Sequence, residues 1–158
     1  MSEGPKPPAV DPATVPARGG SSYPEQFKSE VENRSKQALG NALSLTQFGV
    51  NLVTLEPGAW SAHRHWHANE DEFVYILEGE LVLVTDAGEQ ALGPGMAAGF
   101  PAGVADGHHL VNRGDRAARY LEVGTRAADD EVAYPDVDLH LVTKASVPQF
   151  TNKNGDPY

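Results

Sequence analysis

Five of the six histidines fall into two short clusters, which makes them the first candidates for chemistry. His63, His65 and His67 alternate along one segment, and His108 and His109 stand together further along the chain. In a β-strand, residues i and i+2 lie on one face about 6.6 Å apart. The imidazoles of His65 and His67 can therefore converge on one ion at about 2.0–2.1 Å, so the alternation predicts a metal site.

A carboxylate and a third imidazole would complete such a site. Glu72 begins the next apolar run after His67, and a further histidine on a distant strand would close the ring. Three imidazoles and one carboxylate leave one or two open positions on an octahedral ion, as Lewis-acid or O2 chemistry requires. We therefore expect one divalent metal, with Fe, Mn, Ni, Zn and Cu all compatible. His63 shares the face of its neighbours and is predicted to be a catalytic proton carrier.

Composition excludes several other functions. With no cysteine, a thiolate zinc site, an iron–sulfur cluster and a cysteine nucleophile are impossible, so nitrogen and oxygen must hold the metal. The net charge of -10, with 12 Lys and Arg, argues against nucleic-acid or anionic-membrane partners. No apolar run reaches about 18 residues, and the N-terminus lacks a signal sequence, so we expect a cytoplasmic protein without a membrane span.

The spacing of apolar runs predicts an all-β fold. From Ser44 onward, short apolar runs are interrupted by Gly, Pro and Asp roughly every 8–12 residues, which is typical of a sandwich or barrel. The segment 136–143 offers one further candidate strand, and the acidic run Asp129–Glu131 is interpreted as solvated surface. The strands are expected over residues 45–56, 61–67, 72–78, 80–85, 89–92, 96–100, 108–112 and 118–123.

Four segments are expected along the chain. Residues 1–22 are rich in proline and are predicted to form a mobile, disordered arm. Residues 23–44 are predicted to pack on the barrel and contain, over 23–39, the only plausible helical stretch. The barrel itself is assigned to residues 45–125, and residues 126–158 form a C-terminal extension.

Two predicted strands carry apolar residues on both faces, which bears on assembly. In Phe73–Leu77 and in Leu81–Val84 every position but Tyr75 is fully apolar, whereas a strand with one solvated face should alternate. Both faces must therefore be covered. The second cover is either the N-terminal segment or a partner subunit, and we expect a homodimer.

Two groups of spaced residues stand out: Gly58, His65-Trp66-His67, Glu72 and Gly79, and then Gly95, Pro101-Ala102-Gly103, His108 and Asn112. Their spacing resembles the two motifs of the cupin superfamily. Two spacers depart from the family pattern: six residues rather than five separate Gly58 from His65, and four rather than two separate Gly103 from His108. An alternative frame with His63, His65 and Glu70 is rejected because Glu70 lies too far from Gly79, and His109 stays an alternative third imidazole.

The resemblance implies a double-stranded β-helix, the jelly-roll barrel of cupins, with His65, His67, Glu72 and His108 as metal ligands. The superfamily includes dioxygenases, decarboxylases, isomerases, lyases and ligand-binding regulators, so the fold does not fix the activity. We expect a mononuclear metalloenzyme, an oxidoreductase or an isomerase or lyase, acting on a small polar or anionic molecule. The alternative is a non-catalytic barrel that binds or senses a sugar-like ligand.

Overall fold

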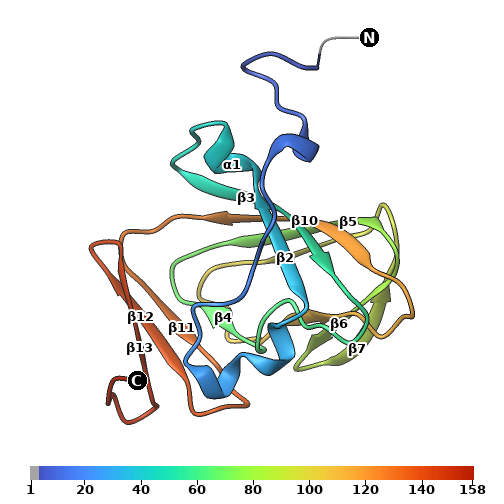
Figure 1. Ribbon diagram of the computed structural model, residues 1–158. Coiled ribbons are helices and arrows are strands. Elements are labelled where there is room, and N and C mark those ends of the chain that lie inside the picture. Colours follow the sequence, from blue (N-terminus) through green and yellow to red (C-terminus); the bar gives the residue numbers. More distant parts are fainter. Residues whose placement is uncertain (1–3) are drawn as a thin grey trace.

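The chain forms a β-barrel from antiparallel sheets (Figure 1), as a computed structural model that describes residues 4–158 shows. The six-stranded sheet has the order β1-β2-β3-β10-β5-β8, and the others are β13-β12-β11-β4 and β7-β6-β9. The bounds are β1 Arg18–Gly19, β2 Arg34–Ala38, β3 Phe48–Leu55, β4 Trp66–His67, β5 Glu72–Glu78, β6 Leu81–Thr85, β7 Gly88–Leu92, β8 Ala97–Phe100, β9 His109–Val111, β10 Ala118–Thr125, β11 Asp130–Ala133, β12 His140–Lys144 and β13 Val147–Thr151. The predicted all-β class and jelly-roll fold are confirmed.

The main core lies between the six-stranded and the three-stranded sheets. Leu55 of β3, Ile76 of β5, Leu81 of β6 and Tyr120 of β10 are fully buried there. Each comes from an alternating strand that turns its other side chains outward. The six-stranded sheet therefore presents one face to the interior of the barrel, and that face carries the residues of the site described below.

A second, smaller core joins the N-terminal segment to the C-terminal extension. Tyr23 and Val31 pack there with Val132, Tyr134 and Leu139. The two segments are far apart in sequence, and Figure 1 shows them side by side at the end of the barrel near β4 and β11. They close that end of the barrel and cover one side of the histidine segment.

The predicted strands agree with the structure in the barrel and less well outside it. Residues 72–78 form β5 with the predicted bounds. The expected strand over 61–67 is shorter, since only Trp66 and His67 form β4. Two strands of the extension, β11 and β13, were not predicted, because their sequences do not alternate clearly between apolar and polar residues.

The helical prediction for residues 23–39 was wrong. Two short 3-10 helices, η2 Glu25–Phe27 and η3 Ser29–Val31, precede β2, and the four-residue α1 Leu39–Ala42 follows it. The apolar side chains of the segment do not form the stripe that a longer helix needs. Strand β2 instead pairs along β3 and becomes part of the barrel wall.

The described part of the N-terminal arm contacts the barrel at several points. It contains the 3-10 helix η1 Pro12–Thr14, and β1 pairs with β2. The side-chain amide of Gln37 donates hydrogen bonds to the carbonyls of Pro12 and Val15, at 2.6 and 2.9 Å. The boundaries of the four predicted segments stay predictions. None of the helices in residues 4–158 has the length and apolar character required to cross a bilayer.

Candidate metal centre

Backbone pairing brings the histidine clusters together. Residues His65 and His108 form an antiparallel bridge, in which each backbone N–H donates to the other residue's carbonyl at 3.2 and 2.9 Å. Strand β4 then pairs with β11, which fixes His67 opposite Val132. Glu72 begins β5 on the neighbouring sheet. Three separate backbone segments therefore deliver the four predicted ligands to one place.

The three imidazoles all direct Nε2 at the Glu72 carboxylate. His108 Nε2 lies 2.7 Å and His65 Nε2 3.3 Å from Glu72 Oε2, while His67 Nε2 lies 3.6 Å from Oε1. The ligand atoms of His65, His67 and Glu72 all lie within 4.8 Å of one another. A set of imidazoles and one carboxylate, half-buried and converging, fits a divalent first-row ion. The chemistry of these donors thus agrees with the predicted metal site.

Hydrogen bonds hold the second ring nitrogen, Nδ1, of both His65 and His67. Nδ1 of His65 donates to the carbonyl of His63 at 2.7 Å, and Nδ1 of His67 lies 2.6 Å from Asp130 Oδ2. Histidine ligands usually donate their second N–H to a carbonyl or carboxylate, which fixes the tautomer and leaves Nε2 as the donor to the metal. The hydrogen bonds therefore prepare the Nε2 lone pairs for coordination.

Asp130 is a site residue that the sequence reasoning missed. It was expected on a solvated acidic surface, yet its exposed fraction is 4%. Its two carboxylate oxygens accept from the His67 ring and from the backbone N–H of Asn69, at 2.6 and 2.8 Å. The neighbours Asp129 and Glu131 are exposed as predicted. Alternation along β11 turns Asp130 and Val132 inward, but the flanking acids conceal that pattern in the sequence.

His63 does not reach the metal cluster. Its Nε2 lies 2.9 Å from the carbonyl of Phe27, and its ring packs against Tyr23 and Trp60 in the second core. The catalytic role predicted for this side chain finds no support in that position, because His63 is not among the residues that line the cavity. Its contribution to the site is the backbone carbonyl that orients His65.

His108, and not His109, faces Glu72. The His108 ring stacks on Phe100 of β8 with a centroid distance of 3.6 Å, which holds its plane toward the carboxylate. The His109 ring instead lies 4.7 Å from the Trp60 ring, and its Nδ1 bonds with the carbonyl of Ala62. Burial lowers the pKa of His109, so this imidazole is held neutral. The geometry favours the predicted choice of the third imidazole.

Charge compensation is strong within the cluster. Burial raises the pKa of Glu72, but hydrogen bonds from His108, His65 and His67 hold it well below its ordinary value. Burial lowers the pKa of His67, but Glu72 and Asp130 together raise it to about 9. Without a metal, a proton on His67 therefore balances the carboxylates. A metal ion that takes this position must displace that proton.

The cluster opens into a cavity of about 240 Å³ inside the barrel. Its lining also includes three charged residues, Arg34 and Lys36 of β2 and Glu122 of β10, which lie on the same six-stranded sheet as Glu72. Lys36 Nζ and Asn51 Nδ2 donate to Glu122 Oε1 at 2.7 and 3.0 Å. Burial raises the pKa of Glu122, but the Lys36 ammonium and the Asn51 amide lower it below its ordinary value. The cavity therefore combines a metal-ligand set with a polar, charged wall.

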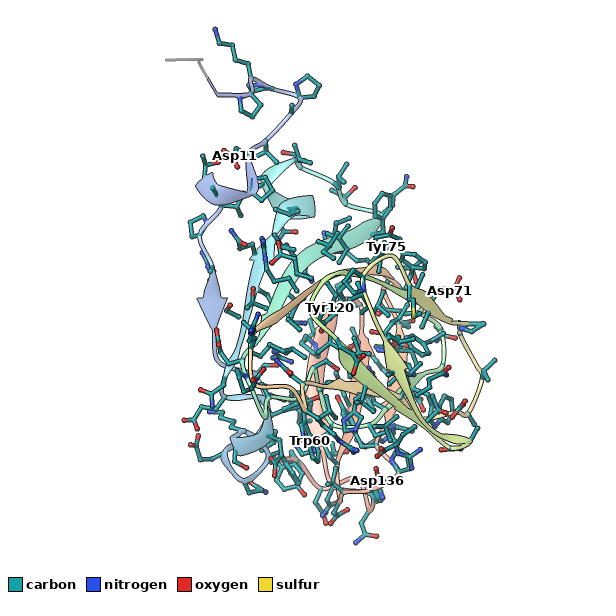
Figure 2. The ribbon with its side chains drawn as sticks, turned by 90° about the vertical axis from the view of Figure 1, so that its right-hand side faces the viewer. Asp11, Trp60, Asp71, Tyr75, Tyr120 and Asp136 are labelled. Carbon is teal, nitrogen blue, oxygen red and sulfur yellow. The ribbon has the colours of Figure 1, made fainter. Side chains whose placement is uncertain are left out.

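Figure 2 labels Tyr120, a residue of the strand that also carries Glu122. Tyr120, next but one to Glu122 on β10, lies in the interior, while Asp71 and Asp136 lie at the periphery. None of the three charged wall residues was predicted as a site residue. Arg34 and Lys36 belong to a segment without a recognisable motif, and only the pairing of β2 with β3 places them inside the barrel.

Comparisons with known proteins identify the family. The family model for the cupin domain matches residues 51–124. A sugar phosphate isomerase of the cupin superfamily from Silicibacter pomeroyi has 47% identity and a TM-score of 0.92, with 96% of each chain covered. This chain belongs to the cupin superfamily. No curated protein sequence matches it.

Two further solved structures are similar. A proposed sugar phosphate isomerase from Acidithiobacillus ferrooxidans has 30% identity and a TM-score of 0.72, covering 79% of this chain and 80% of its own. The polyketide cyclase RemF from Streptomyces resistomycificus has 22% identity and a TM-score of 0.59, covering 74% and 78%. The cyclase supports the fold alone.

Proposed function

We propose that this protein is a metal-dependent isomerase that acts on a small phosphorylated sugar. The observation that carries the proposal is the cavity itself, which joins a three-histidine, one-carboxylate cluster to a wall bearing Arg34 and Lys36. A phosphorylated sugar offers hydroxyl and carbonyl oxygens to the metal and an anionic group to the cations. The similarity to a sugar phosphate isomerase over 96% of both chains supports the same substrate class.

In this proposal His65, His67, Glu72 and His108 hold one divalent ion. When bound, the ion polarises a substrate carbonyl and the neighbouring hydroxyl as a Lewis acid. The hydrogen bonds of His65 with the His63 carbonyl and of His67 with Asp130 keep these ligands in position. The four ligands are compatible with Fe, Mn, Ni, Zn and Cu, and the metal identity is a question for measurement.

Glu122 is the candidate proton carrier. An aldose–ketose isomerisation moves one proton between adjacent carbons and one between their oxygens, so no atoms are gained or lost. Glu122 lines the cavity, and its lowered pKa keeps it ionised and able to accept a proton. Within residues 4–158 both of its hydrogen bonds go to Oε1, so Oε2 remains for the substrate. Lys36 and Asn51 hold the carboxylate in position.

The size and charge of the cavity restrict the substrate further. A chamber of about 240 Å³ inside a barrel suits a small molecule and excludes a polymer. The phosphate binds on the side of Arg34, and the carbonyl end of the sugar reaches the metal ligands. The overall charge of -10 confines anion binding to this local group of cations.

The experiment that tests the proposal measures metal content and turnover together. The untagged protein is purified, its metal is measured by mass spectrometry, and aldose phosphates are converted under NMR observation with O2 uptake recorded in parallel. We expect about one equivalent of metal and interconversion of an aldose and a ketose phosphate without O2 uptake. The double variant His65→Ala/His67→Ala should lose both metal and turnover.

Other outcomes would contradict the proposal. Oxygen consumption coupled to substrate loss would replace isomerisation by oxygenase chemistry. A fully metal-loaded protein that binds sugar phosphates but converts none of the aldose phosphates tested would be a binding protein and not an isomerase. The variant Glu122→Gln separates metal binding from proton transfer, because it is expected to retain the metal and lose at least a hundredfold in kcat.

A further inference from the structure

Arg34 is a cation of the cavity without a counter-ion. One Nη donates to the carbonyl of Ser61, and Nη2 donates to the carbonyl of Gly20 at 3.3 Å. A guanidinium has five N–H donors, and carbonyls carry no net charge. Among residues 4–158 no carboxylate lies within ion-pair distance of Arg34. Within residues 4–158 its positive charge is therefore uncompensated in the cavity.

Two polar atoms on the same wall lack hydrogen-bond partners. Arg34 Nε and the Tyr120 hydroxyl are buried, and among residues 4–158 neither has a partner with good hydrogen-bond geometry, although Ser61 is close enough to lower the pKa of Tyr120. An unsatisfied buried donor costs free energy, and such groups need an explanation in a native structure. Both residues line the cavity. An anion in the cavity would accept hydrogen bonds from the two Nη N–H groups of Arg34 that the carbonyls of Ser61 and Gly20 do not take.

The neighbouring Lys36 does not play the same part. Its ammonium is 2.7 Å from Glu122 Oε1, so the lysine charge is already balanced. Arg34 also offers a planar set of donors that matches two oxygens of one phosphate, which a lysine ammonium cannot do. The charge and the geometry both select Arg34 as the principal anion-binding group.

Arg34 and the metal ligands line the same cavity, and the charges of Arg34 and Glu72 both affect the tyrosines in its wall. Burial raises the pKa of three tyrosines that line the cavity, Tyr23, Tyr120 and Tyr134. The positive charge of Arg34 lowers the pKa of each, and the negative charge of Glu72 raises it. Because they line one cavity, a small molecule with a chelating end and an anionic end can contact both the metal ligands and Arg34.

We propose that Arg34 is the specificity-determining residue that binds the phosphate group of the substrate through its guanidinium. The inference rests on the proposed function for the identity of the anion as part of a sugar phosphate. It adds a residue that no motif of the sequence indicates, and it predicts preference for phosphorylated over neutral sugars. Phosphate binding at this position is independent of turnover and can be measured without it.

The first test is calorimetric titration with inorganic phosphate. Wild type, Arg34→Gln, Arg34→Lys and Arg119→Gln are each titrated both metal-loaded and after chelator treatment. Arg119 is the matched control, because it pairs with Glu78 on the exposed side of β10. We expect at least tenfold weaker phosphate binding in Arg34→Gln, an intermediate loss in Arg34→Lys, and none in Arg119→Gln.

Arg34→Gln loses the hydrogen bonds to Ser61 and Gly20. A second measurement therefore uses the wild-type protein, so that it does not depend on the folding of this variant. The Nε–H resonance of Arg34 in the wild-type protein, assigned by its absence in Arg34→Lys, is followed by NMR during the phosphate titration. We expect a saturable shift with the dissociation constant found by calorimetry. A resonance that does not move while phosphate binds would overturn the inference.

The remaining outcomes separate this inference from the proposed function. Phosphate binding that disappears on chelation and is unaffected by Arg34→Gln would place the anion on the metal and overturn the inference. Isomerase turnover with an unchanged KM in Arg34→Gln would overturn it as well, while leaving the function intact. Arg34-dependent phosphate binding in a protein that isomerises no sugar phosphate would support the anion site and remove the proposed activity.

Discussion

At the scale of single residues, Asp130 shows how a buried carboxylate controls a metal ligand. It holds Nδ1 of His67 at 2.6 Å and is itself fixed by the Asn69 backbone. We predict that Asp130→Asn weakens metal affinity about 10–100-fold, since the amide no longer supports the tautomer with a lone pair on Nε2. Competition with a chelator measures the affinity. Glu131→Gln, an exposed neighbour, is the control, and equal affinity in both variants would contradict the prediction.

Glu122 gives a prediction about pH at the same scale. Its folded pKa lies below the ordinary value, so its interactions with Lys36 and Asn51 stabilise the protein fully above the unfolded pKa. That stabilisation is lost as the pH falls through the folded pKa. We therefore expect Glu122→Gln to be less stable than wild type at pH 7, with a gap in unfolding free energy that narrows toward pH 3. Urea unfolding across this range measures the gap, and a constant gap would refute the assignment.

At the scale of elements, the β5–β6 turn depends on one glycine. Gly79 has a φ of 75°, and an added Cβ would lie 2.9 Å from the Ala118 Cβ on β10. We predict that Gly79→Ala lowers the free energy of unfolding by about 2 kcal/mol or more, through strain and contact together. Gly93→Ala is the matched control, because the φ of Gly93 is not positive and no atom of residues 4–158 lies within 4 Å of an added Cβ. Equal stability of the two variants in urea would contradict this reading of the turn.

The elements also explain how far the sequence could predict the site. Strand β5 was located correctly because its apolar residues and flanking turns are local signals. The four predicted ligands could be proposed because their spacing resembles a known motif, and the bridge between His65 and His108 then brings them together. Asp130 and Arg34 could not be found in this way. They reach the site through the pairing of β11 with β4 and of β2 with β3, and such long-range pairing leaves no local pattern.

At the scale of the whole molecule, the outer face of the six-stranded sheet carries exposed apolar side chains that a further element could cover. Val74 and Ile76 of β5 are buried, whereas Phe73, Tyr75 and Leu77 are 43%, 38% and 38% exposed. Phe48 of β3 is also exposed and lies beside Phe73. Contiguous apolar patches of this kind usually mark an interface. The described N-terminal segment does not cover these side chains, which leaves a partner subunit as the predicted cover.

We predict that the protein is a homodimer through this face, formed by two copies of the same patch around a twofold axis. Light scattering after size exclusion should give twice the 16.9 kDa of the chain. Tyr75→Glu places a charge at the centre of the patch and should give a monomer with unchanged circular dichroism and metal content, because Tyr75 points away from the cavity. Val147→Glu, at an exposed apolar residue on β13, is the control and should leave the dimer intact. A wild-type monomer at micromolar concentration would contradict the prediction, and a dimer that survives Tyr75→Glu would place the interface on another surface.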